Sequence, residues 1–148
     1  MQIIQGQCKK QSRNVKIEDL PRVKREALEM LALCHKPLGR FPYALALAHC
    51  QVEHLDPLQF FVTKDAQLII NPKILYANRK GKNQTEGCMS YAFRSEVTVR
   101  RYESIQVKYQ QLDREGNIIE KEQEFTDLMA RIFQHEIDHF NTYSIYGH

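Results

Sequence analysis

The 148-residue sequence lacks several features that would assign it to a class at once. No stretch approaches 18 consecutive apolar residues, which argues against a transmembrane helix. The N-terminus has no secretory apolar core, and Glu18 and Asp19 come early for an organellar transit peptide. Repeats and low-complexity tracts are also missing. We therefore expect a cytoplasmic protein of a bacterial or phage-infected cell, with an organelle as the remaining alternative.

Paired cysteines and strong charge are absent too. The four cysteines, at positions 8, 34, 50 and 88, have no paired spacing, so they do not indicate a disulfide scaffold and fit a reducing compartment. The net charge of +3 suits a mildly basic surface near ribosomes, but it does not indicate specific nucleic-acid recognition. Length and a hydrophobic content of 43% predict one domain over residues 1–148, which we expect to be a monomer.

A histidine pair near the C-terminus is the most informative feature of the sequence about function. His135 and His139 are four residues apart, and Glu136 follows the first histidine. Four residues of an α-helix turn about 400°, so the two imidazoles share one face and can hold a divalent metal. The adjacent carboxylate can accept a proton from water at that metal. The motif therefore predicts metal-assisted hydrolysis.

The surrounding residues place this motif on the apolar side of its helix. Gln134, Asp127 and Asp138 are expected on the opposite, polar side. Buried histidine and glutamate side chains are costly unless they are paired or bound to metal, so a metal site is favoured over a solvated helix edge. The apolar residues that share the side of the histidines are Leu128, Met129, Ile132, Phe133 and Phe140.

A zinc-type site usually takes three protein ligands and a water, so a third ligand is required. Downstream positions are poor candidates, because the residue six places after His139 is Ile145 and His148 stands at the chain end. Among the four upstream cysteines Cys88 stands out, because Gly87 before it permits an unusual backbone or a close approach. The competing interpretation of a lone cysteine is a small buried hydrophobe.

Three segments resemble the motifs of the peptide deformylase family. Residues 86–90 read EGCMS, similar to the family's EGCLS, and residues 134–139 read QHEIDH, similar to QHExDH. Residues 44–51, ALALAHCQ, match the motif G-x-G-x-A-A-x-Q in part, because Ala44 and Ala46 replace glycines and His49 replaces an alanine. The segments follow the family's order, so the chain resembles a short form of the family with a degraded first motif.

The resemblance implies an α+β fold of short, mostly antiparallel strands around a central metal-ligand helix. It implies one divalent metal held by Cys88, His135 and His139, with Fe(II) or Zn(II) expected and nickel or cobalt as alternatives. It also implies removal of the N-formyl group from the initiator methionine of new polypeptides, so N-formyl-methionyl peptides are the expected substrates. The alternatives are a related metal amidase with another substrate and a non-catalytic, metal-stabilised relative.

The resemblance also implies roles for individual residues around the metal. Glu136 would act as acid and base, and Gln51 and the backbone N–H of Met89 would bind the formyl oxygen. Glu86 and Asp138 are candidates for orienting the ligands. For Asp138, a solvated helix position is an equal alternative.

The expected substrate pocket has an apolar wall with one charge at its edge. The apolar residues are Leu45, Leu128 and Ile132. Arg131 lies four residues before His135, and we favour a packed stem with a solvated guanidinium over a group that recognises the substrate. For His49 we likewise favour a packed histidine over an extra acid–base group.

The pattern along the chain predicts two helices and several short strands. The helices are expected at residues 23–34 and 125–142. A polar loop is expected at residues 53–57, a further loop at 78–85 and a hairpin turn at 115–117. The strands are expected at residues 45–51, 60–62, 68–70, 97–99, 105–112 and 118–125.

Overall fold

The computed structural model of the protein describes residues 1–52 and 56–146. Its centre is one antiparallel sheet of five strands, in which each strand pairs with its neighbour in the sequence. The strands are β1 (Ala46–Ala48), β2 (Phe60–Thr63), β3 (Leu68–Glu86), β4 (Val97–Leu112) and β5 (Ile118–Thr126). The helices are α1 (Leu20–Cys34) and α2 (Asp127–Phe140), with three short 3-10 turns, η1 (Ile17–Asp19), η2 (His49–Gln51) and η3 (Met89–Tyr91).

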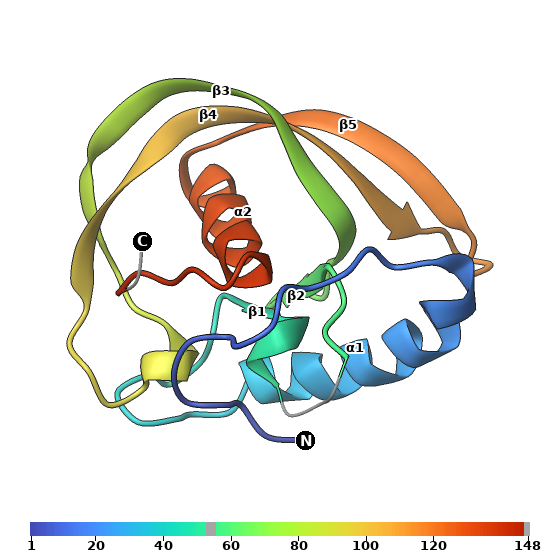
Figure 1. The fold of residues 1–148 in the computed structure, drawn as a ribbon, viewed down its shortest axis with the longest axis horizontal. Helices are drawn as coiled ribbons and strands as arrows, with labels where there is room; N and C mark the ends of the chain where they lie inside the picture. The colour runs from blue at the N-terminus through green and yellow to red at the C-terminus, as the bar shows by residue number, and fades with distance from the viewer. Residues whose placement is uncertain (53–55, 147–148) are drawn as a thin grey trace.

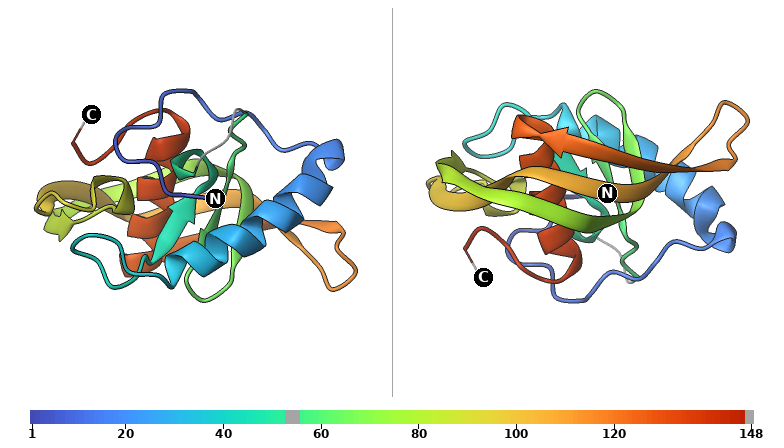
Figure 2. Two further views of the ribbon diagram at one scale, coloured as in Figure 1. Left: turned by 90° about the horizontal axis from the view of Figure 1, so that it is seen from below. Right: turned by 90° about the horizontal axis from the view of Figure 1, so that it is seen from above.

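The long strands curve around α2. Figure 1 shows β3, β4 and β5 arching over this helix, while α1 lies at the opposite end of the molecule beside β2. The views from below and above in Figure 2 show the same arrangement, with α2 crossing beneath the curved strands. The predicted α+β architecture with a central ligand helix is confirmed.

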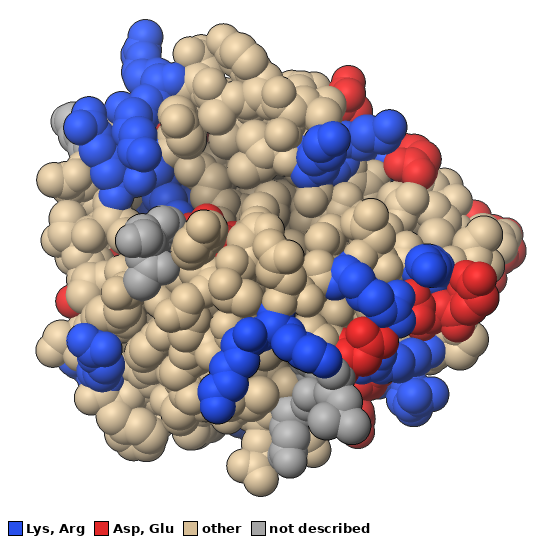
Figure 3. All heavy atoms as spheres, in the orientation of Figure 1, with Lys and Arg blue, Asp and Glu red and all other residues tan. Residues whose placement is uncertain are grey.

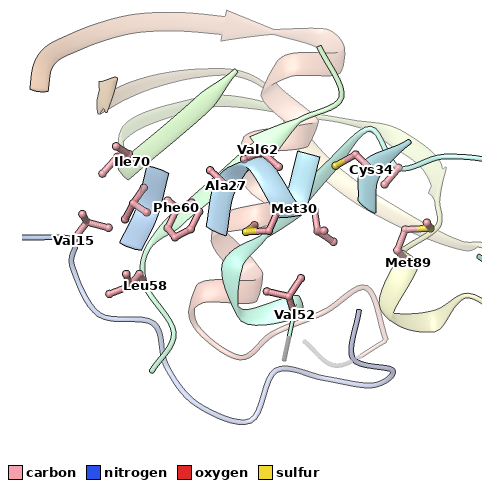
Figure 4. Close-up of a cluster of buried hydrophobic side chains, with 13 residues drawn as sticks. Val15, Ala27, Met30, Cys34, Val52, Leu58, Phe60, Val62, Ile70 and Met89 are labelled. Carbon is pink, nitrogen blue, oxygen red and sulfur yellow. The ribbon is translucent and has the colours of Figure 1, made fainter. Parts of the chain in front are cut away.

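Helix α1 forms where the sequence pattern predicts a helix. Pro21 lies in its first turn, where the missing N–H costs nothing. Its buried face consists of residues spaced by three or four, which pack on β2 and on the turn η3 (Figure 4). These residues are Val23, Ala27, Met30 and Cys34.

A second core lies between α2 and the sheet. Phe133 is fully buried and contacts the rings of Phe61, Tyr109 and Phe125 at centroid distances of 5.2, 5.7 and 4.5 Å. Aromatic pairs in such edge-to-face and offset geometries stabilise a core beyond simple area burial. This packing fixes the distance between α2 and the sheet, and therefore the position of the histidines of α2.

Several predicted boundaries were wrong. Residues 71–86 were expected to include a loop, but they continue β3 as one long strand paired with β4 through three register shifts. Residues 97–112 likewise form one strand rather than two. The strand expected at 45–51 ends at Ala48, and η2 follows it. Of the polar loop expected at 53–57, residues 53–55 lie outside the described residues, as does His148.

Two features of the described chain relate to its expected location and partners. Within the described ranges, no helix is long and apolar enough to cross a membrane. Figure 3 shows lysine and arginine side chains spread over one face, in keeping with the net charge of +3.

Candidate metal centre

A buried glutamine that precedes the histidines fixes helix α2 to the sheet. Gln134 was expected on the polar side of the helix, but it is buried. Its Nε2 donates to the carbonyl of Tyr102 at 2.9 Å, and its Oε1 accepts from the N–H of the same residue at 2.8 Å. Strand β4 leaves this backbone unit unpaired on one side, and the glutamine satisfies both of its groups. This contact sets the rotation of α2 about its own axis.

Cys88 reaches the helix from the end of β3. A Cβ on Gly87 would lie 2.5 Å from the ring of Phe41 and 3.2 Å from Cγ of Glu96, so the chain needs glycine here for close approach. Cys88 is 6% exposed, and its Sγ lies 3.4 Å from Nε2 of His139.

Three ligand atoms therefore converge. One atom each from Cys88, His135 and His139 lies within 4.8 Å of the others, and the two imidazole rings are 5.0 Å apart at 69°. In a tetrahedral site, bonds of about 2.3 Å to sulfur and 2.0 Å to nitrogen put those two atoms about 3.5 Å apart. The observed 3.4 Å is close to that value.

The surroundings of Glu136 also fit a metal bound at this group. Its side chain is 3% exposed, and its Oε2 has no hydrogen-bond partner among the described residues. Burial raises the pKa of Glu136 to about 7, because the carboxylate is removed from water. A cation held by the adjacent histidines would offset that cost. A thiolate and two imidazoles also suit iron or zinc.

A buried ion network orients the first histidine. Nδ1 of His135 lies 2.9 Å from Oε1 of Glu86, which leaves Nε2 for a metal. Arg101 binds both oxygens of Glu86, at 2.9 and 3.0 Å, and reaches Oδ2 of Asp138 at 2.7 Å. Burial would raise the pKa of Glu86, but the hydrogen bonds from His135 and Arg101 outweigh it and hold that pKa at about 2. Asp138 is thus ion-paired.

Gln51 and the segment after Cys88 lie together on the other side of the ligand group. Oε1 of Gln51 accepts from the N–H of Ala48 at 2.9 Å. Its Nε2 donates to Oγ of Ser90 at 3.0 Å and to Sγ of Cys88 at 3.4 Å. The amide nitrogen therefore faces the site and can turn one of its hydrogens from the sulfur to a substrate oxygen.

A cavity of about 350 Å³ opens beside these residues. Arg131 lines it, with Nη2 donating to the carbonyl of Thr85 at 3.1 Å and Nε lying 3.7 Å from Glu86. The guanidinium is thus hydrogen-bonded at the cavity rim. This differs from the solvated guanidinium that the sequence predicted. Other lining residues are Leu45, Gln51, Glu86, Cys88, Met89, Leu128, Ile132, His135 and Glu136, all singled out from the sequence.

The departures in the first motif are accommodated without strain. Neither Ala44 nor Ala46 is among the residues with positive φ in the described part of the chain, so neither needs glycine for its backbone. His49 is fully buried, with Nδ1 accepting from the N–H of Leu58 at 2.9 Å and its ring stacked on Phe60 at 4.4 Å. It is absent from the described cavity lining, which agrees with a packed histidine.

Two residues of the site had no predicted role. Arg101 could have been found, because it shares a strand face with Val99, Ile105 and Val107 at even spacing, which is an unusual place for a charge. Ser90 closes the EGCMS segment, but the motif assigns it no function. Its contact with Gln51 depends on how two distant segments pack.

Among the described residues, Cys88 and the histidine pair of α2 converge beneath an antiparallel sheet, which defines a protein with a candidate metal site at its centre. The profile of the polypeptide deformylase family matches residues 4–148, and the chain belongs to that family. The family is metal-dependent, and the predicted resemblance is confirmed.

Relatives and solved structures agree with this assignment. The peptide deformylase of Brachyspira hyodysenteriae is 43% identical over 49% of this chain and 36% of its own length. The first relatives are thus matched over less than half of their length. The Thermotoga maritima peptide deformylase structure has a TM-score of 0.77 at 29% identity, covering 94% of this chain and 88% of that chain. The deformylase of Vibrio parahaemolyticus bacteriophage VP16T has a TM-score of 0.75 at 26% identity, covering 98% and 100%.

Proposed function

We propose that this chain removes the N-formyl group from the N-terminal methionine of newly made polypeptides, releasing formate and a free amine. The observation that carries the proposal is the convergence of Cys88, His135 and His139 beside the buried carboxylate of Glu136. Membership of the deformylase family supports the choice of substrate.

The metal would be held by the thiolate and the two imidazoles, and Fe(II) or Zn(II) suits this set, with nickel or cobalt able to replace them. When bound, it supplies a Lewis acid that activates water near neutral pH. Glu86, held by Arg101, keeps His135 in the orientation that ligation needs.

Side chains and backbone groups of the cavity would carry out the remaining steps of the reaction. Glu136 accepts the proton of the attacking water and delivers it to the nitrogen that leaves as an amine. The amide of Gln51 and the N–H of Met89 donate to the formyl oxygen as negative charge develops there. Leu128 and Ile132 form an apolar wall for the methionine side chain.

The expected surroundings of the reaction follow from the substrate. New polypeptides appear at the ribosome, so we expect the protein to act in the cytoplasm, near the ribosome surface. We expect it to work there as a monomer.

A carboxamide in place of the general base tests the proposal. Glu136→Gln keeps the shape of the side chain but removes the proton acceptor, so formate release from formyl-Met-Ala-Ser should fall by at least about 100-fold while metal stays bound. Glu96→Gln is the matched control, because Glu96 lines the same cavity but is exposed and is not adjacent in sequence to a ligand. Equal activity in the two variants would contradict the proposed role of Glu136.

A further inference from the structure

The first residues of the chain cross η2 and η3, the two segments that we propose bind the formyl oxygen. We call residues 3–8 the N-terminal strap. The N–H of Ile4 donates to the carbonyl of Gln51 at 2.7 Å, and the N–H of Gly6 donates to the carbonyl of Ser90 at 2.6 Å. Figure 1 shows this dark blue segment passing beside the yellow turn η3. The strap therefore links η2 and η3, which are far apart in the sequence.

One side chain of the strap binds both ends of η3. Nε2 of Gln5 donates to the carbonyl of Met89 at 2.8 Å, and its Oε1 accepts from the N–H of Ala92 at 3.0 Å. Both groups of the amide are used on backbone atoms, although Gln5 itself is exposed. Gly6 has φ +100°, a value that suits glycine and lets the strap turn from one contact to the next.

Turn η3 is held in place by other segments, since Gln51 donates to Oγ of Ser90 and Ser144 lies within hydrogen-bond distance of the Tyr91 hydroxyl. It is three residues long, and no side chain caps its start. The side chain of Met89 is 5% exposed and packs in the core beside α1 (Figure 4), while its carbonyl is held by Gln5. Two anchors, one apolar and one polar, thus fix the residue whose N–H we assign to the formyl oxygen.

We propose that the N-terminal strap, through Gln5, is a positioning element that holds the Met89 N–H and the Gln51 amide at the separation needed to stabilise the developing oxyanion. The inference rests on the proposed deformylase function. Hydrogen-bond donors lower the activation barrier most when they are fixed in place before the reaction, and small displacements of these donors slow the reaction. Loosening the strap should therefore lower kcat more than it raises KM.

Gln5→Leu removes both amide contacts at an exposed position. Gln7→Leu is the matched control, because Nε2 of Gln7 donates to the carbonyl of Thr142, and no hydrogen bond from this side chain to η2 or η3 is found among the described residues. The first measurement needs no activity. The chain has four methionines, and all except the N-terminal one have a backbone amide that ¹⁵N-methionine labelling makes visible by NMR. In zinc-loaded Gln5→Leu, the Met89 amide cross-peak should broaden because the loosened turn moves on the μs–ms timescale, with the Met30 and Met129 cross-peaks unchanged.

The second measurement is kinetic. Nickel-loaded Gln5→Leu should lose about tenfold in kcat on formyl-Met-Ala-Ser, with KM within about twofold and metal content unchanged, and Gln7→Leu should match the wild type. An unchanged Met89 line width would overturn the inference, as would a broadened Met89 cross-peak with an unaltered kcat. An inactive wild type would instead overturn the proposed function, while the Met89 line width would still decide whether Gln5 holds the turn.

Discussion

Replacing Arg101 by methionine tests the buried ion network most sharply. Arg101 is 8% exposed and makes two hydrogen bonds to Glu86, whose side chain is 7% exposed. Arg101→Met keeps most of the side-chain volume, but it leaves the Glu86 carboxylate buried with His135 as its strongest partner. Breaking one side of a buried ion pair costs about 3–5 kcal/mol. For a chain of this size that corresponds to a Tm lower by about 8–15 °C.

The adjacent residue supplies the control. Arg100 is exposed, and its Nε donates to the carbonyl of Gly81 at 2.8 Å. Arg100→Met should change the free energy of unfolding by about 0.5–1 kcal/mol. Chemical denaturation of the metal-free proteins measures both costs without the contribution of metal binding. Equal costs for the two variants would refute the assigned role of the network.

A double substitution separates charge from packing. In a Glu86→Gln background the buried carboxylate is gone, so Arg101→Met should cost at least about 1.5 kcal/mol less than it does in the wild type. A cost that does not change with the background would mean that Arg101 stabilises the fold by packing alone, and the argument from the ion pair would fail.

The remaining predictions concern other parts of the site and the surface. Cys88→Ala should abolish stoichiometric metal binding, and full retention of metal measured by atomic absorption would remove Cys88 from the ligand set. Arg131→Leu should change the ratio of kcat/KM for formyl-Met and formyl-Glu peptides by less than about twofold, because the guanidinium already binds Thr85 and lies beside Glu86. A tenfold change in that ratio, about 1.4 kcal/mol, would show that Arg131 recognises substrate. The hydrogen bond from Arg13 lowers the pKa of Asp19 to about 2, so its stabilisation is present above the unfolded pKa near 3.8 and is lost as pH falls toward 2. Asp19→Asn should therefore lower Tm at pH 7 but match the wild type near pH 2, and a constant difference across that range would contradict the pairing.

The sequence predicted the ligand helix well because its chemistry is local. His135, Glu136 and His139 lie on one helix, so the 3.6-residue period alone brings them together. Both helices and the hairpin between β4 and β5 were predicted for the same reason, since apolar spacing and turn residues act over a few positions. Gln51 was predicted from the family resemblance alone, and Cys88 from the glycine before it together with that resemblance; no local pattern joins either residue to that helix.

The failures share a physical cause, which is pairing between distant segments. Residues 71–86 look like a loop, with Pro72 and a polar run, yet pairing with β4 makes them a strand whose bulges absorb the irregular residues. Gln134 looks exposed on the helical wheel, yet it finds the backbone of Tyr102. In both cases a tertiary partner overrides the local preference.

Metal titration under turnover conditions tests the central claim most directly. Metal-free wild type receives Fe(II) anaerobically in steps, and formate release from formyl-Met-Ala-Ser is measured after each step. We predict that activity rises linearly and stops rising at one metal per chain, because we assign one metal to the group formed by Cys88, His135 and His139. Formate release that is independent of added metal, or no release at full occupancy, would contradict the account.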